Sequence, residues 1–84
     1  MFLKFNVFYV FPQYRKLQNR AYYKIVSEME MEELNRLGKG WLRTYFVGKS
    51  FLDRCLIRDI LSGETGHYVP ISEADYKQID LLAK

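Results

Sequence analysis

The segment from residue 27 to residue 40 constrains the fold most, because it carries signals for both ends of a short helix. Ser27 and Glu30 have the spacing of a capping box, in which each side chain accepts a hydrogen bond from the backbone N–H of the other residue. Apolar residues follow at spacings of three, as on one face of a helix: Met31, Leu34 and Leu37. Gly38 offers the left-handed conformation that ends many helices. The pattern predicts a helix capped by Ser27, so Ser27→Ala should cost roughly 1 kcal/mol.

Four glutamates stand near the beginning of this predicted helix, where the helix dipole favours negative charge: Glu28, Glu30, Glu32 and Glu33. Runs of charge are usually solvated helical faces. We therefore interpret these glutamates as structural, rather than as metal ligands or as the binding site of a basic partner. The predicted helix separates two stretches that carry only positive charge.

Three other segments have the composition of strands. Phe, Val and Tyr predominate in residues 2–11, which we expect to form the first and most buried strand, ended by Pro12. Residues 20–26 predict a second strand, because their alternate side chains would divide between the two faces of a sheet. A polar and basic connection over residues 13–19 precedes this strand. Residues 41–47 are rich in aromatic side chains and predict another strand.

The segment 51–61 is ambiguous between strand and helix. Ser50 and Asp53 have the spacing of a further capping box, but the apolar positions match neither period cleanly. The turn-rich residues that follow, and a short strand expected at 67–71, favour a hairpin over residues 56–71. We therefore predict a strand at 51–61, with a helix as the alternative.

The chain ends with a second predicted helix. Ser72 and Asp75 repeat the capping box, and Ile71 and Tyr76 occupy the positions of a hydrophobic staple. Apolar residues continue at helical spacing toward the end of the chain: Tyr76, Ile79 and Leu82. We expect a single α+β domain over residues 1–84, with a mainly antiparallel sheet of about five strands and two short helices in the order β-β-α-β-β-β-α.

The charge and the cysteine content limit the classes of protein to which this chain can belong. The net charge of +3 and the pI near 9.1 are a mild excess that suits an anionic partner without indicating one. Residues 1–49 hold nine Lys or Arg against four acids, whereas residues 50–84 hold four against six. The single cysteine, Cys55, excludes an intrachain disulfide and a cysteine-rich zinc cluster, and it fits a reducing cytoplasm. The apolar opening is about half the length of a transmembrane helix and contains Lys4 and Asn6, so we expect a cytoplasmic chain with no membrane partner.

Motifs for catalysis are weak. Residues 48–50, Gly-Lys-Ser, resemble the end of a phosphate-binding loop, but Arg43 stands where that motif needs another glycine. Sequence spacing gives neither His67 nor Cys55 the neighbours that a general base, a nucleophile or a metal site needs. We expect no enzymatic activity, no cofactor and no metal. A cleft that held Cys55 or His67 beside a carboxylate would return an enzyme to consideration.

One candidate surface is the acid-free stretch 13–24, which combines basic and aromatic residues. Bases stack on tyrosine while lysine and arginine contact phosphates, so this composition suits single-stranded DNA or RNA. The residues that would carry such binding are Tyr14, Arg15, Lys16, Arg20, Tyr23 and Lys24. Because aromatic residues make up 17% of this short chain, many of them must also belong to the core. We keep nucleic-acid binding as the alternative function.

The favoured hypothesis uses the chain's aromatic and basic residues differently. Trp, Tyr and Arg are enriched at the energetic centres of protein interfaces. The anchors that we predict are Trp41, Arg43, Tyr45 and Tyr22. The sequence therefore favours a small non-enzymatic interaction module, of the adaptor, regulatory or inhibitor type, that binds another protein or a second copy of itself. An open strand edge would serve the same purpose, since it recruits a further strand.

Overall fold

The computed structural model describes residues 9–64 and 66–83 of the chain. Five strands and two helices follow one another in the order β-β-β-β-α-β-α: β1 Gln13–Leu17, β2 Ala21–Ile25, β3 Glu30–Leu37, β4 Gly40–Val47, α1 Phe51–Ser62, β5 Tyr68–Pro70 and α2 Glu73–Leu82. The predicted fold class, α+β with an antiparallel sheet and two short helices, is confirmed. The predicted order of elements is wrong at two places: the third element is a strand and not a helix, and the fifth is a helix and not a strand. Neither helix has the length and apolar run needed to span a bilayer, as far as the described residues extend.

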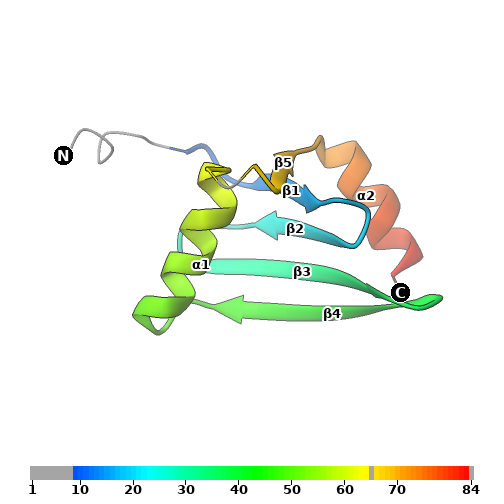
Figure 1. Cartoon of the computed structure of the whole chain (residues 1–84), viewed down its shortest axis with the longest axis horizontal. Coiled ribbons are helices and arrows are strands. Elements are labelled where there is room, and N and C mark those ends of the chain that lie inside the picture. Colours follow the sequence, from blue (N-terminus) through cyan, green and yellow to red (C-terminus); the bar gives the residue numbers. More distant parts are fainter. Residues whose placement is uncertain (1–8, 65, 84) are drawn as a thin grey trace.

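The five strands form one antiparallel sheet in the order β4-β3-β2-β1-β5 (Figure 1). β1 to β4 pair with their neighbours in sequence through short turns. The chain then crosses the sheet as α1 and returns to place β5 beside β1. β4 and β5 are therefore the two edges of the sheet.

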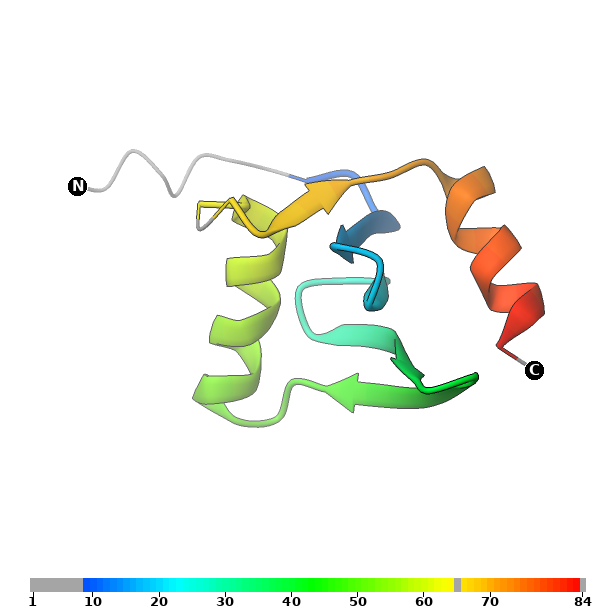
Figure 2. The ribbon, with the colours of Figure 1, turned by 45° about the vertical axis from the view of Figure 1, so that its right-hand side comes forward.

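The two helices cover opposite faces of the sheet, as the view in Figure 2 shows with α1 and α2 on either side of the strands. Buried residues of α1 pack against one face, in a cluster made of Ala21, Tyr23, Ile25, Met31, Ile57, Ile60 and Leu61. α2 packs against the other face, in a cluster made of Tyr14, Leu34 and Tyr76 with the partly buried Tyr22, Trp41, Ile71, Ile79 and Ala83. We call these the α1 face and the α2 face. Side chains alternate between them along every strand.

The acidic segment forms strand β3 and not the predicted helix. Met31 lies on the α1 face and Leu34 on the α2 face, and both are fully buried. A sheet covered on both sides buries residues three apart on opposite faces, so the spacing that suggested one helical face has another origin. Ser27 does not cap a helix. Its Oγ accepts the N–H of Met29 at 3.1 Å in the turn before β3. Gly38, at φ 59°, occupies the tight turn between β3 and β4.

Two further predictions are corrected. Residues 13–19 are not a loose connection, because Gln13–Leu17 is a strand paired to both β2 and β5. Residues 51–61 are helical, so the hairpin over 56–71 is also wrong. The Ser50 Oγ accepts the Asp53 N–H at 3.1 Å, and the helix ends at Gly63 in the left-handed conformation. Local capping decided this segment against its weak apolar periodicity.

Other predictions are confirmed. The strands expected at 20–26 and 41–47 are β2 and β4, and the short strand expected at 67–71 contains β5. The final helix begins where its capping box placed it, since the Ser72 Oγ accepts the Asp75 N–H at 3.0 Å. The strand expected at residues 2–11 lies mostly outside the described residues, and residues 9–11 are not in a strand.

Candidate protein-binding surface

β4 is an edge strand with a neighbour on one side only. It pairs with β3 without interruption from Glu30↔Val47 to Leu37↔Gly40, and no described element lies beyond it (Figure 1). It contains no proline and no bulge in this register. The opposite edge, β5, has three residues and ends at Pro70, which has no N–H to offer. Proteins commonly shorten or block their edge strands, and β4 carries neither protection.

The register of the hairpin identifies the backbone groups that face outward. Gly38 and Lys39 form a two-residue turn between the paired residues Leu37 and Gly40. A turn of this length is closed by a hydrogen-bonded pair, and bonded and non-bonded pairs alternate from there along an antiparallel ladder. The residues of β4 whose N–H and C=O groups point away from β3 are therefore Trp41, Arg43, Tyr45 and Val47. Three of these four are anchors predicted from the sequence.

The side chains of Trp41, Arg43 and Tyr45 follow one another on the α2 face of β4. Trp41 is half-buried, and its ring centroid lies 5.9 Å from that of Tyr22. The guanidinium carbon of Arg36 lies 5.8 Å from the Trp41 ring centroid, in reach of a cation–π interaction. The structure therefore brings all four predicted anchors to one face of the sheet, with Trp41 and Tyr22 partly committed to packing beneath α2.

Arg43 ties the edge strand to the rest of the fold. Its guanidinium contacts Asp80 of α2 at 2.7 Å and Glu32 of β3 at 3.0 Å. The Tyr76 hydroxyl donates a second hydrogen bond to the Glu32 carboxylate, at 2.9 Å. The hydrogen bonds to Asp80 and Glu32 raise the pKa of the Arg43 guanidinium. Arg43 thus positions β4, and its charge is balanced within the chain.

Tyr45 is the most accessible of the four anchors, with 54% of its surface exposed. Its hydroxyl donates to the Glu30 carboxylate at 3.1 Å, and this hydrogen bond raises the pKa of the phenol. The bond holds the ring beside the outward backbone groups of the same residue. Tyr45 therefore presents an oriented aromatic surface together with an open N–H and C=O.

The α1 face of β4 carries a second set of exposed side chains. Leu42 is half exposed, and the first turn of α1 leaves 70% of Phe51 and 76% of Leu52 accessible. Leu37, at the end of β3, is also exposed. These residues form two pairs at opposite ends of the β3–β4 hairpin: Leu37 and Leu42 near its turn, and Phe51 and Leu52 after Val47 (Figure 1). The sequence alone did not single them out, because it does not show which strand is an edge or which side of α1 faces solvent.

The chain segment that contains β4 carries basic side chains only, while the acids near this strand belong to β3 and α2. Residues 34–52 contain no acid, and they carry four basic side chains: Arg36, Lys39, Arg43 and Lys49. Arg43 is neutralised by its carboxylate partners. Lys39 and Lys49 are exposed, and they flank the two ends of the strand. The edge is therefore apolar and aromatic along its length, with a lysine beyond each end and the glutamates of β3 beside it.

The residues predicted for nucleic-acid binding divide into two groups. Tyr14, Arg15 and Tyr23 are buried. The Tyr14 ring packs 5.2 Å from that of Tyr76, and the Tyr23 hydroxyl donates to Glu33 at 2.8 Å. Arg15, only 7% exposed, donates to the carbonyls of Tyr14 and Leu61 and to the Gln13 side chain, and burial lowers its pKa.

The other three candidates, Lys16, Arg20 and Lys24, keep accessible side chains. They are all cations, so the aromatic half of the expected stacking surface lies inside the core. The burial of Arg15 and of the two tyrosines could not be foreseen, because the sequence pattern placed residues 13–19 in a loop.

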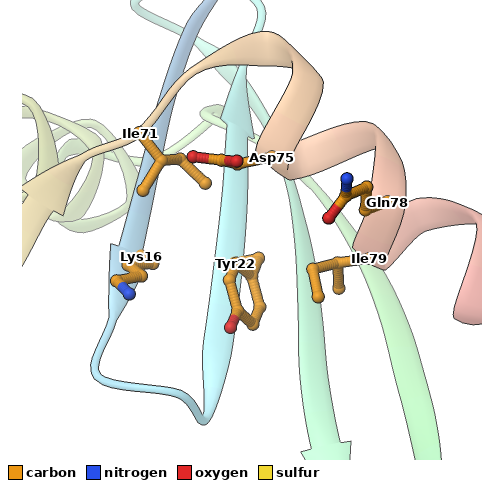
Figure 3. Close-up of a pocket in the computed structure, with 6 residues that line it drawn as sticks. All are labelled: Lys16, Tyr22, Ile71, Asp75, Gln78 and Ile79. Carbon is orange, nitrogen blue, oxygen red and sulfur yellow. The ribbon is translucent and has the colours of Figure 1, made fainter.

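A hollow of about 270 Å³ lies between α2 and the strands β1 and β2 (Figure 3). Its lining residues are Lys16, Tyr22, Ile71, Asp75, Gln78 and Ile79. Small-molecule pockets usually measure about 300 to 1,000 Å³. This hollow falls just below that range, and it adjoins the ring of Tyr22.

Residues 48–50 have structural roles, and Cys55 and His67 belong to different segments of the fold. Gly48 donates its N–H to the Met29 carbonyl, and Ser50 caps α1, so residues 48–50 form the connection from β4 to the helix. Cys55 is partly buried on α1, and His67 lies in the segment just before β5. Among the described residues, no group of three or more His, Cys, Asp and Glu is arranged to hold a metal ion.

Comparison of the chain with protein-family models, with curated proteins and with solved structures found no match. The geometry of the β4 edge therefore carries the functional argument.

Proposed function

We propose that this chain is a small non-enzymatic protein-binding module, of the adaptor or inhibitor type, that holds another protein chain against the β4 edge. The observation that carries the proposal is the unprotected eight-residue strand whose outward backbone groups belong to Trp41, Arg43, Tyr45 and Val47. A bound strand would continue the sheet by hydrogen bonding to these groups, and side-chain contacts would supply selectivity.

The side chains of β4 support the same proposal. Aromatic and arginine residues dominate the energetic centres of protein interfaces. Tyr45 and the outer part of Trp41 are accessible beside the open backbone, and Arg43 is held in place by Glu32 and Asp80. Leu42 adds apolar surface on the other face of the same strand. A partner strand would therefore meet apolar or aromatic side chains on both of its faces.

A backbone-specific variant tests the proposal. Tyr45→Pro removes one outward N–H and leaves the bonds from β4 to β3 in place, and proline is tolerated in edge strands at such positions. Tyr45→Ala is the matched control, because it removes the same ring and keeps the N–H. Tagged wild-type and variant chains are incubated with extract of the source cells, and captured proteins are quantified by mass spectrometry. We expect a partner that wild type captures, that Tyr45→Ala captures less because it lacks the ring, and that Tyr45→Pro loses because it also lacks the N–H.

Circular dichroism of the three proteins establishes that they share one fold. Capture of the same proteins by all three chains would contradict binding at the β4 edge, and so would the failure of wild type to bind any protein, a second copy of itself included.

A further inference from the structure

The β4 edge offers a particular fit to another copy of itself. An antiparallel pair of strands bonds only where outward-facing residues stand opposite each other. In β4 the outward residues are the odd-numbered ones from 41 to 47. Two identical strands related by a two-fold axis can therefore pair with the axis at residue 43, 44 or 45. In a register between these, the outward residues of one copy would stand opposite residues of the other whose N–H and C=O groups point toward β3.

The three registers differ in the number of outward residues that they pair. An axis at Arg43 leaves Val47 beyond the end of the paired strand. An axis at Tyr45 leaves Trp41 beyond the end of the paired strand. An axis at Thr44 pairs all four outward residues, from 41 to 47, and so forms the largest number of backbone hydrogen bonds between the two strands.

We infer that β4 pairs in antiparallel fashion with β4 of a second copy about an axis at Thr44, joining two five-stranded sheets into one. The inference rests on the proposed function, because both use the β4 edge. Arg43 of one copy then faces Tyr45 of the other, an arrangement that favours a cation–π contact. Trp41 faces Val47, and Leu42 faces Phe46. The like charges that stand opposite each other in this register are Lys39 and Lys49, which lie just beyond the two ends of the ladder.

The exposed apolar side chains on the α1 face also find cover in this register. The connection from β4 to α1 follows Val47 directly, so the first turn of α1 in one copy lies beside the β3–β4 turn of the other. Phe51 and Leu52 of the first copy thus approach Leu37 and Leu42 of the second. All four expose half of their surface or more, and pairing removes them from water together.

The flanking lysines give the pairing a distinctive response to salt. In this register Lys39 of one copy lies opposite Lys49 of the other, at both ends of the ladder. Their repulsion is exposed and is therefore screened as ionic strength rises. Dimerisation should tighten between low and moderate salt. Binding of an acidic peptide to the same edge, or of nucleic acid to the basic residues, would weaken over that range.

Cysteine cross-linking tests the register directly, in a Cys55→Ser background. The two Thr44 residues form a non-hydrogen-bonded pair, for which the Cα atoms lie about 4.5 Å apart. That separation is within the range that a disulfide bridges. The two Leu42 residues lie about 13 Å apart, since four residues of strand separate each from the position opposite the other. Thr44→Cys should therefore form a covalent dimer under mild oxidation, and Leu42→Cys, the matched control, should not.

The mass of the chain in solution, measured by light scattering over a range of concentrations, completes the test. We expect a dimer whose dissociation constant rises at least tenfold in Tyr45→Pro. Thr44→Lys, which sets two lysines on the axis, provides a second disrupting variant if the proline variant does not fold. A dimer unaffected by both variants, or equal cross-linking of the two cysteine variants, would overturn the inference.

A monomeric chain would also overturn it, and the capture experiment then separates two cases. If the monomer captures a different protein that Tyr45→Pro loses, the proposed function stands without self-pairing. If the monomer captures nothing, both fail.

Discussion

The chain should lose stability steeply in alkaline solution, because two tyrosines are buried with their hydroxyls bonded to carboxylates. Tyr23 is 5% exposed and donates to Glu33 at 2.8 Å, and Tyr76 is 3% exposed and donates to Glu32 at 2.9 Å. Burial, followed by the hydrogen bond to the carboxylate, raises the pKa of each phenol well above its ordinary value of 10.0. A phenolate at either position would lie against a negative charge, so the folded chain keeps both protons.

The size of the effect follows from proton linkage. The unfolded chain releases both protons as the pH passes 10, and the folded chain retains them until its raised pKa values are reached. Stability is therefore complete below pH 10 and falls above it. Each tyrosine contributes a loss of about 1.4 kcal/mol per pH unit, so the pair removes about 2.7 kcal/mol per unit. Two pH units remove about 5 kcal/mol, which is comparable to the whole stability of a small domain.

Urea unfolding between pH 8 and pH 12 measures this dependence. Tyr23→Phe and Tyr76→Phe should each reduce the slope above pH 10 by about 1.4 kcal/mol per pH unit, because each removes one titrating group. Because the chain has seven tyrosines, phenolate absorbance at 295 nm is compared between wild type and each variant, and the part that a substitution removes should appear together with the loss of structure. Ionisation of these tyrosines near pH 10 in the intact fold would refute the reasoning, and so would slopes that the two substitutions leave unchanged.

Three further outcomes are expected. Ser50→Ala should cost about 1 kcal/mol in urea unfolding because it removes the cap of α1, whereas Ser27→Ala should cost less because Ser27 lies in a turn; equal costs would contradict the placement of these two serines. Arg15→Met should cost about 1 to 3 kcal/mol because it removes buried hydrogen bonds to the carbonyls of Leu61 and Tyr14, of which the second keeps the Ile71 N–H, and a neutral effect would show that the Arg15 bonds are not formed. Fluorescence polarisation with labelled single-stranded DNA at low salt should detect no binding; affinity that falls with salt and is reduced by Arg20→Ala or Lys16→Ala would favour the alternative function.

The sequence predicted the fold class because several elements carry local signals that tertiary contacts do not override. The caps at Ser72 and Ser50 both formed, and the aromatic strand at 41–47 formed with one residue added at its start. The segment 51–61 shows the limit of periodicity. Its helix buries Ile57, Ile60 and Leu61, while Phe51 and Leu52 remain exposed and blur the apolar pattern.

The helix predicted for the acidic segment, residues 27–40, is wrong for a different reason. Its capping residues and its spacing of three agree with a helix as well as with a strand buried on both faces, and only the second helix, α2, makes the latter possible. The side chains of the glutamates also point to both faces of this strand, since Glu30, Glu32 and Glu33 accept hydrogen bonds from tyrosines on the two faces of the sheet. Local sequence does not reveal that a strand will be covered twice.

The candidate site was predictable in its residues and not in its geometry. Trp41, Arg43 and Tyr45 attracted attention by residue type, and the structure places them on the one long open edge among the described strands. Strand order is a property of the whole fold, so neither the open backbone of Tyr45 nor the burial of Arg15 could be derived from the local pattern. The order of the strands in the sheet is what places these aromatic and basic residues on one edge.

Backbone hydrogen exchange along β4 tests the central claim most directly, because alternate amides either bond to β3 or point away from it. The N–H groups of Leu42, Thr44 and Phe46 bond to β3 and should exchange slowly under all conditions. Those of Arg43 and Tyr45 point outward, and they should become protected only when the chain is bound to its partner, in samples concentrated enough to pair. Fast exchange at Arg43 and Tyr45 at every concentration, and in the presence of every captured protein, would contradict the assignment of β4 as the binding edge.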